Sequence, residues 1–360
     1  MKHTGLIISE ARCKTVRAPL VRPFRIATGQ HDELENVFLV VKLESGVKGF
    51  GEAAVARHIT GETIEQTVKN LGAVAYGLKG CDISDPFAMC RALKPVLDGN
   101  HAALAALEMA VLDAFTRSLR IPLWRLFGDR PARLATDITI VIGSVAEAEA
   151  GAEDYYGRGF RAFKIKVGRD ADLDLKRVLA VAKRAPHSAL ILDANQGFTA
   201  ETMLGFLKTL RARGVTPVLL EQPVPKADLD GLRKLTRLAG VPVCADESAG
   251  SFQDVARLLK DNVVNAVNVK FMKSGILEGA EIARLARAKG ARLMIGAMME
   301  SALSITAAAH CAAGMGCFDF IDLDTTFFLK GPLSCAPYLD AQGRFDFSGA
   351  RAGIGVAVRI

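Results

Sequence analysis

Acidic residues end three consecutive apolar runs in the second half of the chain. Asp193 ends the run LILD, Glu221 ends VLLE and Asp246 ends VPVCAD. If these runs are neighbouring parallel strands, the three carboxylates converge at one edge and need a cation between them to stay ionised together. Oxygen ligands without His or Cys favour Mg²⁺ over zinc. The pattern predicts a magnesium site, and three separate salt bridges to Arg and Lys are the alternative.

Two lysines are spaced to act on either side of this site. Lys166 ends the run AFKIK, and Lys270 ends AVNVK four runs later, so the two face each other across an eight-stranded barrel. Lys164 points the same way as Lys166, and this like-charge pair is expected to lower an ammonium pKa towards neutrality. The pattern predicts that one amine removes a proton α to a metal-held carboxylate and the other returns a proton to the opposite face. A Schiff-base lysine is the chemical alternative, but it needs no carboxylate cluster.

A further acidic pair, Asp322 and Asp324, follows the last apolar run, FDFID. Residues two apart on a strand point the same way, so both carboxylates would face the barrel interior opposite the metal. Such a pair could hold a substrate ammonium group. The alternative is the start of a loop on the barrel rim.

Eight short apolar runs alternate with amphipathic helical segments from about residue 134 onwards. They end about 25 residues apart, near Gly143, Lys166, Asp193, Glu221, Asp246, Lys270, Gly296 and Asp322. Strands separated by helices pair in parallel, and eight near-equal units favour a closed barrel. A doubly wound sheet is the alternative, but no Gly-rich phosphate loop follows the first strand.

The first third of the chain has a different texture, typical of an α+β fold. A hairpin is expected around Ser45-Gly46, followed by helices that begin near Thr63, Asp85 and His101. The C-terminal segment GRFDFSGARAGIGVAVRI reads as strand that returns to this first part. The domains predicted are an α+β cap (1–130), a barrel (131–322) and a returning C-terminal segment (323–360).

Composition narrows the class of protein. The 360 residues are 50% hydrophobic and 24% charged, and this hydrophobic content excludes a disordered chain. The net charge of +7 leaves a non-enzymatic alternative, a basic barrel that binds a polyanion. The N-terminus shows no signal peptide, and no stretch has the character of a membrane span. Seven scattered cysteines without a C-x-x-C pair fit a reduced cytoplasmic protein.

The ordered motifs KIKVG, DANQGF, LLEQPV, CADES, NVKFMKSGI and IGAMMES resemble the muconate-lactonising-enzyme subgroup of the enolase superfamily over essentially the whole chain. The resemblance implies a modified TIM barrel of the (β/α)7β type with an α+β capping domain built from the N-terminal part and the C-terminal tail. It also implies roles for the residues above. Mg²⁺ would be bound by Asp193, Glu221 and Asp246, with Asn195 and Glu247 in support; Lys166 and Lys270 would be the acid/base pair, and Lys164 an auxiliary lysine that contacts the substrate carboxylate.

Within this subgroup, DLDTT resembles the D-x-D signature of dipeptide epimerases, in which Asp322 and Asp324 would bind the substrate α-ammonium. Muconate cycloisomerases and N-succinylamino acid racemases have no free ammonium to hold, and they remain the alternatives. Thr139 stands at a substrate-contacting position. Met299 stands at a pocket position that is aliphatic in Ala-Glu epimerases and acidic in some relatives acting on cationic dipeptides.

The family's specificity loops fall at 21–30 and 54–63. Gly29 stands where similar Ala-Glu epimerases carry an Arg, so that positive charge is missing here. The positive charge could come instead from three other residues of these loops, Arg25, Arg57 and His58; the alternative is that they are ordinary loop cations. We therefore expect a Mg²⁺-dependent epimerase that inverts the α-carbon of the C-terminal residue of an L-Ala-Xaa-type dipeptide, with Xaa open. The expected partners are a small dipeptide and further copies of the chain in a homo-oligomer, with neither nucleic acid nor membrane.

Overall fold

The computed structural model describes residues 5–27 and 29–359, without the side chain of His58. Its first described part is an antiparallel sheet of β1 (Ile8–Ile26), β2 (Gly29–Leu43) and β3 (Lys48–Ala53) in that order. The predicted hairpin is confirmed, because β2 pairs with β3 and the turn contains Gly46 with φ +85°.

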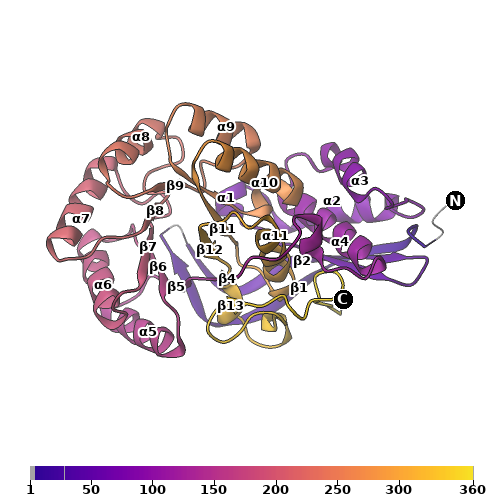
Figure 1. Ribbon diagram of the computed structural model, residues 1–360, viewed down its shortest axis with the longest axis horizontal. Coiled ribbons are helices and arrows are strands. Elements are labelled where there is room, and N and C mark those ends of the chain that lie inside the picture. Colours follow the sequence, from indigo (N-terminus) through magenta and orange to yellow (C-terminus); the bar gives the residue numbers. More distant parts are fainter. Residues whose placement is uncertain (1–4, 28, 360) are drawn as a thin grey trace.

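Within the segment 21–30, expected as a loop, the residues up to Ile26 belong to β1 and those from Gly29 belong to β2, at the far end of the β1–β2 hairpin; residue 28 lies outside the described residues. The pairing of β1 with β2 shifts in register between Pro19 and Phe24 and then resumes up to Ile26 opposite Gly29. The hairpin reaches from the cap to the mouth of the barrel (Figure 1), where the carbonyl of Arg25 accepts a hydrogen bond of 3.1 Å from the N–H of Ile142.

Helices complete the cap. They are α1 (Arg57–Thr60), α2 (Ile64–Gly77), α3 (Pro86–Leu93) and α4 (His101–Ser118). The Thr63 side chain caps α2 and the Asp85 side chain caps α3, at the predicted starts. Helix α4 lies directly on β3, where a Cβ on Gly51 would come within 1.9 Å of the carbonyl oxygen of Ala106. Only glycine allows the helix and strand backbones to approach this closely.

The barrel has eight parallel strands among the described residues, in chain order β5 to β12 around the sheet. They are β5 (Ile138–Ile140), β6 (Ala162–Lys166), β7 (Ala189–Asp193), β8 (Leu219–Glu221), β9 (Val243–Ala245), β10 (Ala266–Val269), β11 (Arg292–Gly296) and β12 (Phe320–Asp322). The helices between them are α5 (Val145–Arg158), α6 (Ala171–Arg184), α7 (Ala200–Ala212), α8 (Leu229–Leu238), α9 (Phe252–Lys260), α10 (Phe271–Ala288) and α11 (Ala302–Met315). This is the predicted (β/α)7β barrel, with α5 to α9 curving around its outside (Figure 1).

The seam between the last strand and the first is closed by individual hydrogen bonds. The N–H of Asp137 donates to the carbonyl of Ile321 (2.8 Å), and the N–H of Leu323 donates to Oγ1 of Thr136 (2.8 Å). The seam therefore places the residues that precede β5 directly against those that follow β12.

The C-terminal segment contains less β-strand than the sequence analysis predicted. Up to residue 359, the last one described, it forms the single strand β13 (Arg344–Phe345), which pairs with β4 (Leu134–Ala135), and then runs irregularly along α4. There the N–H of Ile354 donates to Asp113 at 2.7 Å. Gly353 and Gly355 have positive φ angles, which interrupt an extended backbone. Four 3₁₀ helices lie elsewhere in the described residues: η1 (Lys94–Leu97), η2 (Leu123–Leu126), η3 (Thr325–Phe328) and η4 (Pro332–Ser334).

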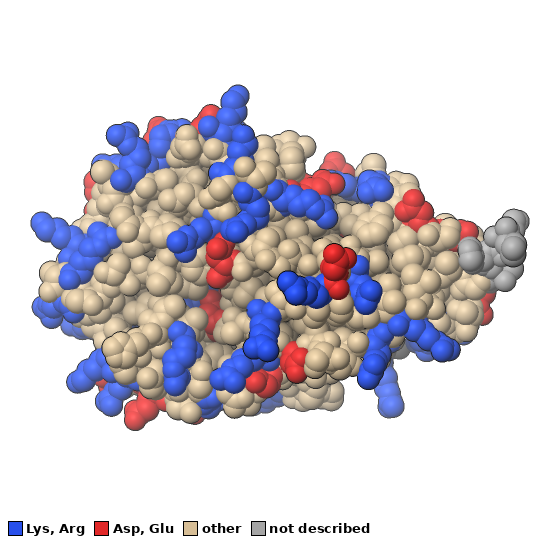
Figure 2. Space-filling model, in the orientation of Figure 1, with Lys and Arg blue, Asp and Glu red and all other residues tan. Residues whose placement is uncertain are grey.

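The excess of positive charge is distributed over the molecule. On the face shown in Figure 2, Lys and Arg side chains are spread over the outer barrel helices and the cap, with Asp and Glu among them. No helix among the described residues is both long enough and apolar enough to cross a membrane.

Candidate active site

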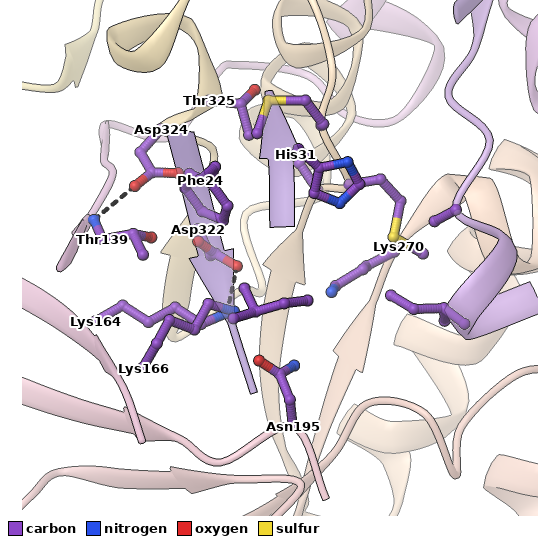
Figure 3. A pocket seen from close by; sticks show the side chains of 16 residues that line it. Phe24, His31, Thr139, Lys164, Lys166, Asn195, Lys270, Asp322, Asp324 and Thr325 are labelled. Atoms are coloured by element: carbon purple, nitrogen blue, oxygen red, sulfur yellow. Dashed lines mark hydrogen bonds and ion pairs between the residues drawn. The ribbon is translucent and has the colours of Figure 1, made fainter. Parts of the chain in front are cut away.

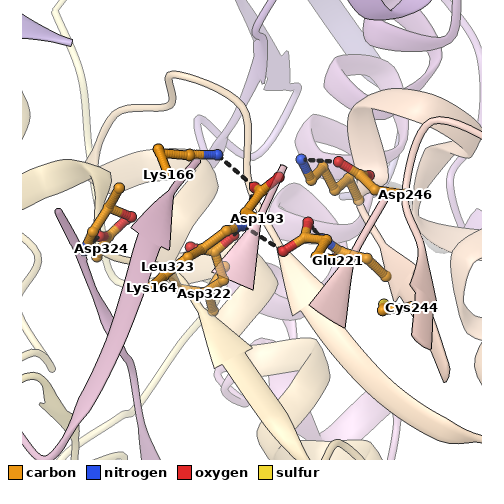
Figure 4. A network of polar contacts seen from close by, with 12 residues as sticks. Lys164, Lys166, Asp193, Glu221, Cys244, Asp246, Asp322, Leu323 and Asp324 are labelled. Atoms are coloured by element: carbon orange, nitrogen blue, oxygen red, sulfur yellow. Dashed lines mark hydrogen bonds and ion pairs between the residues drawn. The ribbon is translucent and has the colours of Figure 1, made fainter. Parts of the chain in front are cut away.

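The ends of β7 and β8 and the residue after β9 bring the three predicted metal ligands together in the barrel interior. Asp193, Glu221 and Asp246 are fully buried and come from adjacent strands (Figure 4). Lys164 and Lys166 project from β6 towards them on the same side of the strand. The Lys164 Nζ lies 3.0 Å from Asp193 Oδ2 and 2.8 Å from Glu221 Oε2, and Lys166 binds the same oxygen of Asp193.

Asp246 is held from the other side of the barrel. The Nζ of Lys270, which follows β10, lies 2.8 Å from Asp246 Oδ2. The Nζ of Lys273 lies 2.8 Å from Asp246 Oδ1 and also donates to the backbone carbonyls of Asp246 (2.7 Å) and Asn268 (3.0 Å). The Nδ2 of Asn268 donates to Glu221 Oε1 at 2.8 Å. The carboxylates are thus oriented by a shell of amines and one amide.

The pKa of Lys164 differs from the value expected from the sequence. Burial lowers the pKa of Lys164, but Asp322, Glu221 and Asp193 more than offset it and raise that pKa well above its ordinary value. Burial likewise opposes the charged form of Lys270, and Asp246 raises its pKa in the same way. The predicted lowering by a like-charge pair is not found at Lys164, because the attraction of these three carboxylates raises its pKa instead.

The residues present fit a hard divalent cation such as Mg²⁺. The donors are carboxylate oxygens from three adjacent strands, without His or Cys among them. Asn195, on the loop after β7, donates from its backbone to Asp193 Oδ1 (3.0 Å) and from Nδ2 to Glu247 Oε1 (3.4 Å). The Oδ1 of Asn195 and the Oε2 of Glu247 are buried and have no hydrogen-bond partner within the described part of the chain. Buried orphaned oxygens beside a carboxylate cluster are the chemistry that a bound cation satisfies.

A pocket opens above this cluster. Lys166 and Lys270 enter it from opposite sides, and their side chains point towards its centre (Figure 3). The end of β11 makes room for Lys270, since a Cβ on Gly296 would lie 3.0 Å from Lys270 Cε and 2.6 Å from Asn268 Oδ1. A group bound in the pocket would have one amine on each face.

The acidic pair after β12 lines the same pocket. Asp322 Oδ2 lies 2.7 Å from Lys164 Nζ, and Asp324 Oδ2 accepts a hydrogen bond of 2.6 Å from the backbone N–H of Thr139 on β5 (Figure 3). Burial and the neighbouring Asp322 raise the pKa of Asp324 to about 7. Both carboxyl groups therefore line the pocket, and Asp322 shares the amine of Lys164 with the candidate metal ligands Asp193 and Glu221.

The mouth of the pocket is largely apolar. Phe24, Ile26 and His31 from the β1–β2 hairpin, Ile59 from α1, and Met298 and Met299 after β11 line it. The carbonyl of Met299 accepts a hydrogen bond of 2.9 Å from Nδ2 of Asn36, which ties this wall to the cap. Among the described lining residues neither Arg25 nor Arg57 occurs: Arg25 binds Gln30 at 3.0 Å, and Arg57 is exposed. The side chain of His58 lies outside the described residues.

Sequence reasoning missed Lys273, Asn268 and Asp137. Two of them stand in the motif NVKFMKSGI, and Asn268 lies two residues before Lys270, which is the spacing that puts both on one face of β10. Lys273 has no such signal, because it begins a helical segment. Asp137 precedes β5, at the opposite end of the strand from where a barrel site is sought.

Comparison with known proteins gives the family. A model described as mandelate racemase / muconate lactonizing enzyme, N-terminal domain, matches residues 8–128, and one described as enolase C-terminal domain-like matches residues 147–359. A hydrophobic dipeptide epimerase of Citrifermentans bemidjiense is 60% identical over 98% of both chains.

Two solved structures are similar over nearly the whole chain. The mandelate racemase/muconate lactonizing protein from Herpetosiphon aurantiacus has a TM-score of 0.92 at 36% identity, covering 99% of both chains. The dipeptide epimerase from Enterococcus faecalis V583, complexed with Mg and the dipeptide L-Leu-L-Tyr, has a TM-score of 0.89 at 31% identity, covering 97% of this chain and 99% of that one. The chain belongs to the mandelate racemase/muconate lactonizing enzyme family of the enolase superfamily, as its motifs predicted.

Proposed function

We propose that the chain is a Mg²⁺-dependent dipeptide epimerase that inverts the α-carbon of the C-terminal residue and favours hydrophobic residues there. The observation that carries this proposal is the placement of Lys166 and Lys270 on opposite sides of one pocket, between a carboxylate triad and an acidic pair. A substrate held between them would present one face of its α-carbon to each amine. A proton removed by one amine and returned by the other inverts the centre.

The triad of Asp193, Glu221 and Asp246 would hold the metal, with Asn195 and Glu247 beside it. When bound, Mg²⁺ supplies positive charge that stabilises the negative charge developing at the substrate carboxylate as the α-proton leaves. Lys164 would donate to the same carboxylate, because its amine lies within 3.0 Å of Asp193 and Glu221. These groups would hold the carboxylate end of the substrate next to the two lysines.

Asp322 and Asp324 would bind the free N-terminal ammonium of the dipeptide. Both carboxyl groups are buried in the pocket, and a buried carboxyl pair needs a cation for compensation. This pair favours a dipeptide over the substrates of a muconate cycloisomerase or an N-succinylamino acid racemase, which have no ammonium to place there.

The apolar mouth of the pocket supports a hydrophobic second residue. Phe24, Ile26, Ile59 and Met299 offer no charge to a substrate side chain. The relative from Citrifermentans bemidjiense, 60% identical, is named a hydrophobic dipeptide epimerase. The Enterococcus faecalis structure is complexed with Mg and L-Leu-L-Tyr. Both likenesses support the same reading of this pocket.

The seven cysteines are consistent with a protein that works in the reducing cytoplasm. All seven are free thiols in the structure. Persistent free thiols are typical of proteins kept reduced by the cytosol.

A library of L-Ala-L-Xaa dipeptides in deuterated water tests this function. The enzyme with Mg²⁺ should add one deuterium at the α-carbon of Xaa, read as a mass shift, with the largest rates for Leu, Phe, Tyr and Met. N-succinyl-L-Phe and muconate serve as substrates for the alternatives. Turnover of either one without turnover of any dipeptide would contradict the proposal.

A further inference from the structure

Asp137 is a buried acid that the mechanism above does not use. It stands at the barrel seam, immediately before β5, and only 1% of its surface is exposed. Its backbone is held by the 2.8 Å hydrogen bond from its N–H to the carbonyl of Ile321. Both of its carboxyl oxygens, however, are buried without a hydrogen-bond partner among the residues that the structure describes. An ionised carboxylate in this state would be strongly destabilising.

The neighbours of Asp137 are the two residues proposed to bind the substrate ammonium. One oxygen each of Asp137, Asp322 and Asp324 lie within 4.8 Å of one another. Among the described residues, the ion pair of this cluster joins Asp322 to Lys164, and the same amine also lies within 3.0 Å of Asp193 and Glu221. Three carboxyl groups thus share part of one positive charge.

Charge balance favours a neutral group in this cluster. Burial, Asp322 and Asp324 raise the pKa of Asp137 well above its ordinary value, and Lys164 only partly opposes them. A substrate ammonium brings a single positive charge. With Lys164 beside it, the net charge of the cluster is closer to zero when two of the three carboxyl groups are ionised than when all three are. A protonated carboxyl is also a hydrogen-bond donor. Its O–H could therefore donate to the carboxylate of Asp322 or Asp324, which lie beside it.

We propose that Asp137 is a positioning residue of the ammonium subsite, which stays protonated and donates its O–H to the pair formed by Asp322 and Asp324. The inference rests on the proposed dipeptide substrate and extends it to the residue behind the pair. Its effect is to hold the two carboxylates in place and to keep one negative charge out of the cluster. Asp137 acts on the substrate indirectly, through Asp322 and Asp324.

The proposal is tested by two substitutions that differ in hydrogen bonding and resemble each other in size. Asp137→Leu removes the donor, and we expect it to raise KM for L-Ala-L-Phe about tenfold or more, with a smaller change in kcat. Asp137→Asn keeps a neutral donor of the same shape, so it should recover most of the affinity that Asp137→Leu loses. Asp113→Asn, at a fully buried acid of the cap, is the matched control and should leave KM unchanged.

An infrared spectrum supplies a readout that does not depend on turnover. At pH 9 the Mg²⁺-loaded wild type should show a carboxylic acid C=O stretch that is absent from Asp137→Asn. A wild type without this band, or an Asn variant as impaired in KM as the Leu variant, would overturn the proposal. Failure of the wild type to epimerise any dipeptide would instead contradict the proposed function, and the infrared band would still report the proton on Asp137.

Discussion

Lys164 on β6 is bound to Asp322 at the end of β12, with 2.7 Å between its Nζ and the carboxylate Oδ2. The same amine lies within 3.0 Å of Asp193 and Glu221. One buried side chain therefore joins the proposed metal ligands to the acidic pair across the barrel. A dipeptide spanning these two groups would place its α-carbon between Lys166 and Lys270, which is the arrangement that epimerisation requires.

Asp324→Asn should impair dipeptides selectively. The change removes one of two buried negative charges facing the ammonium, and we expect a fall of about 100-fold in kcat/KM for L-Ala-L-Phe. The loss should appear mainly in KM. Steady-state assays with circular dichroism detection measure it, and the exposed Asp261→Asn is the control of equal charge change. A fall of similar size in Asp261→Asn would show that net charge, and not the ammonium contact, is responsible.

Lys273→Met should weaken metal binding. Its amine orients Asp246 through the carboxylate and the backbone carbonyl, and loss of such an outer contact typically costs about 10- to 100-fold in metal affinity. Titration calorimetry with Mg²⁺ measures the dissociation constant directly. The exposed Lys260→Met is the matched control. Equal dissociation constants in the wild type and Lys273→Met would remove Lys273 from the metal site.

Met299→Glu should shift the substrate preference towards cationic dipeptides. The side chain lines the apolar mouth of the pocket, and a carboxylate there would attract Lys or Arg at the second position of the dipeptide. We expect kcat/KM for L-Ala-L-Lys relative to L-Ala-L-Phe to rise about tenfold or more. Val21→Glu, at an exposed position of β1 that is not among the lining residues, adds the same charge outside the pocket. An unchanged ratio in Met299→Glu would place the second residue elsewhere.

His310 makes stability depend on pH far from the active site. Burial on α11 lowers the pKa of its imidazole from 6.5 to about 3, and its Nε2 lies 3.2 Å from the carbonyl oxygen of Ile354. Below pH 6.5 the imidazole is protonated in the unfolded chain, whereas in the folded chain it stays neutral down to about pH 3. The free energy of unfolding therefore decreases as the pH falls from 6.5 to about 3.

His310→Gln removes this titration. Between pH 6.5 and pH 4.5, the free energy of unfolding should decline about 2 kcal/mol less in the variant than in the wild type. Urea denaturation at the two pH values measures the difference. Equal declines would mean that His310 is protonated inside the fold.

The arrangement of the candidate site could be predicted from the sequence because it repeats one simple feature. Lys166, Asp193, Glu221 and Asp322 each end a buried strand, and strand ends in a parallel barrel meet at one face. Regular spacing of the apolar runs was enough to order these strands around the barrel. The pairing of polar residues two apart followed from the period of a strand.

The rest depends on contacts between segments distant in sequence. Pro19 and Pro23 in β1 are typical of a loop, and only the long pairing with β2 makes this segment a strand. The position of Asp137 beside Asp322 depends on how β5 closes against β12. The pKa of Lys164 depends on which carboxylates reach its amine, a distance that no sequence pattern contains.

Exchange of the α-hydrogen in deuterated water tests the two-lysine mechanism most directly. With Mg²⁺, the wild type should incorporate deuterium into both epimers of Ala-Phe. Lys166→Ala and Lys270→Ala should each abolish epimerisation while retaining exchange into one epimer only, opposite for the two variants, because each amine serves one face. The Lys166→Ala, Lys270→Ala double variant should show no exchange, and undiminished exchange in it would contradict the account.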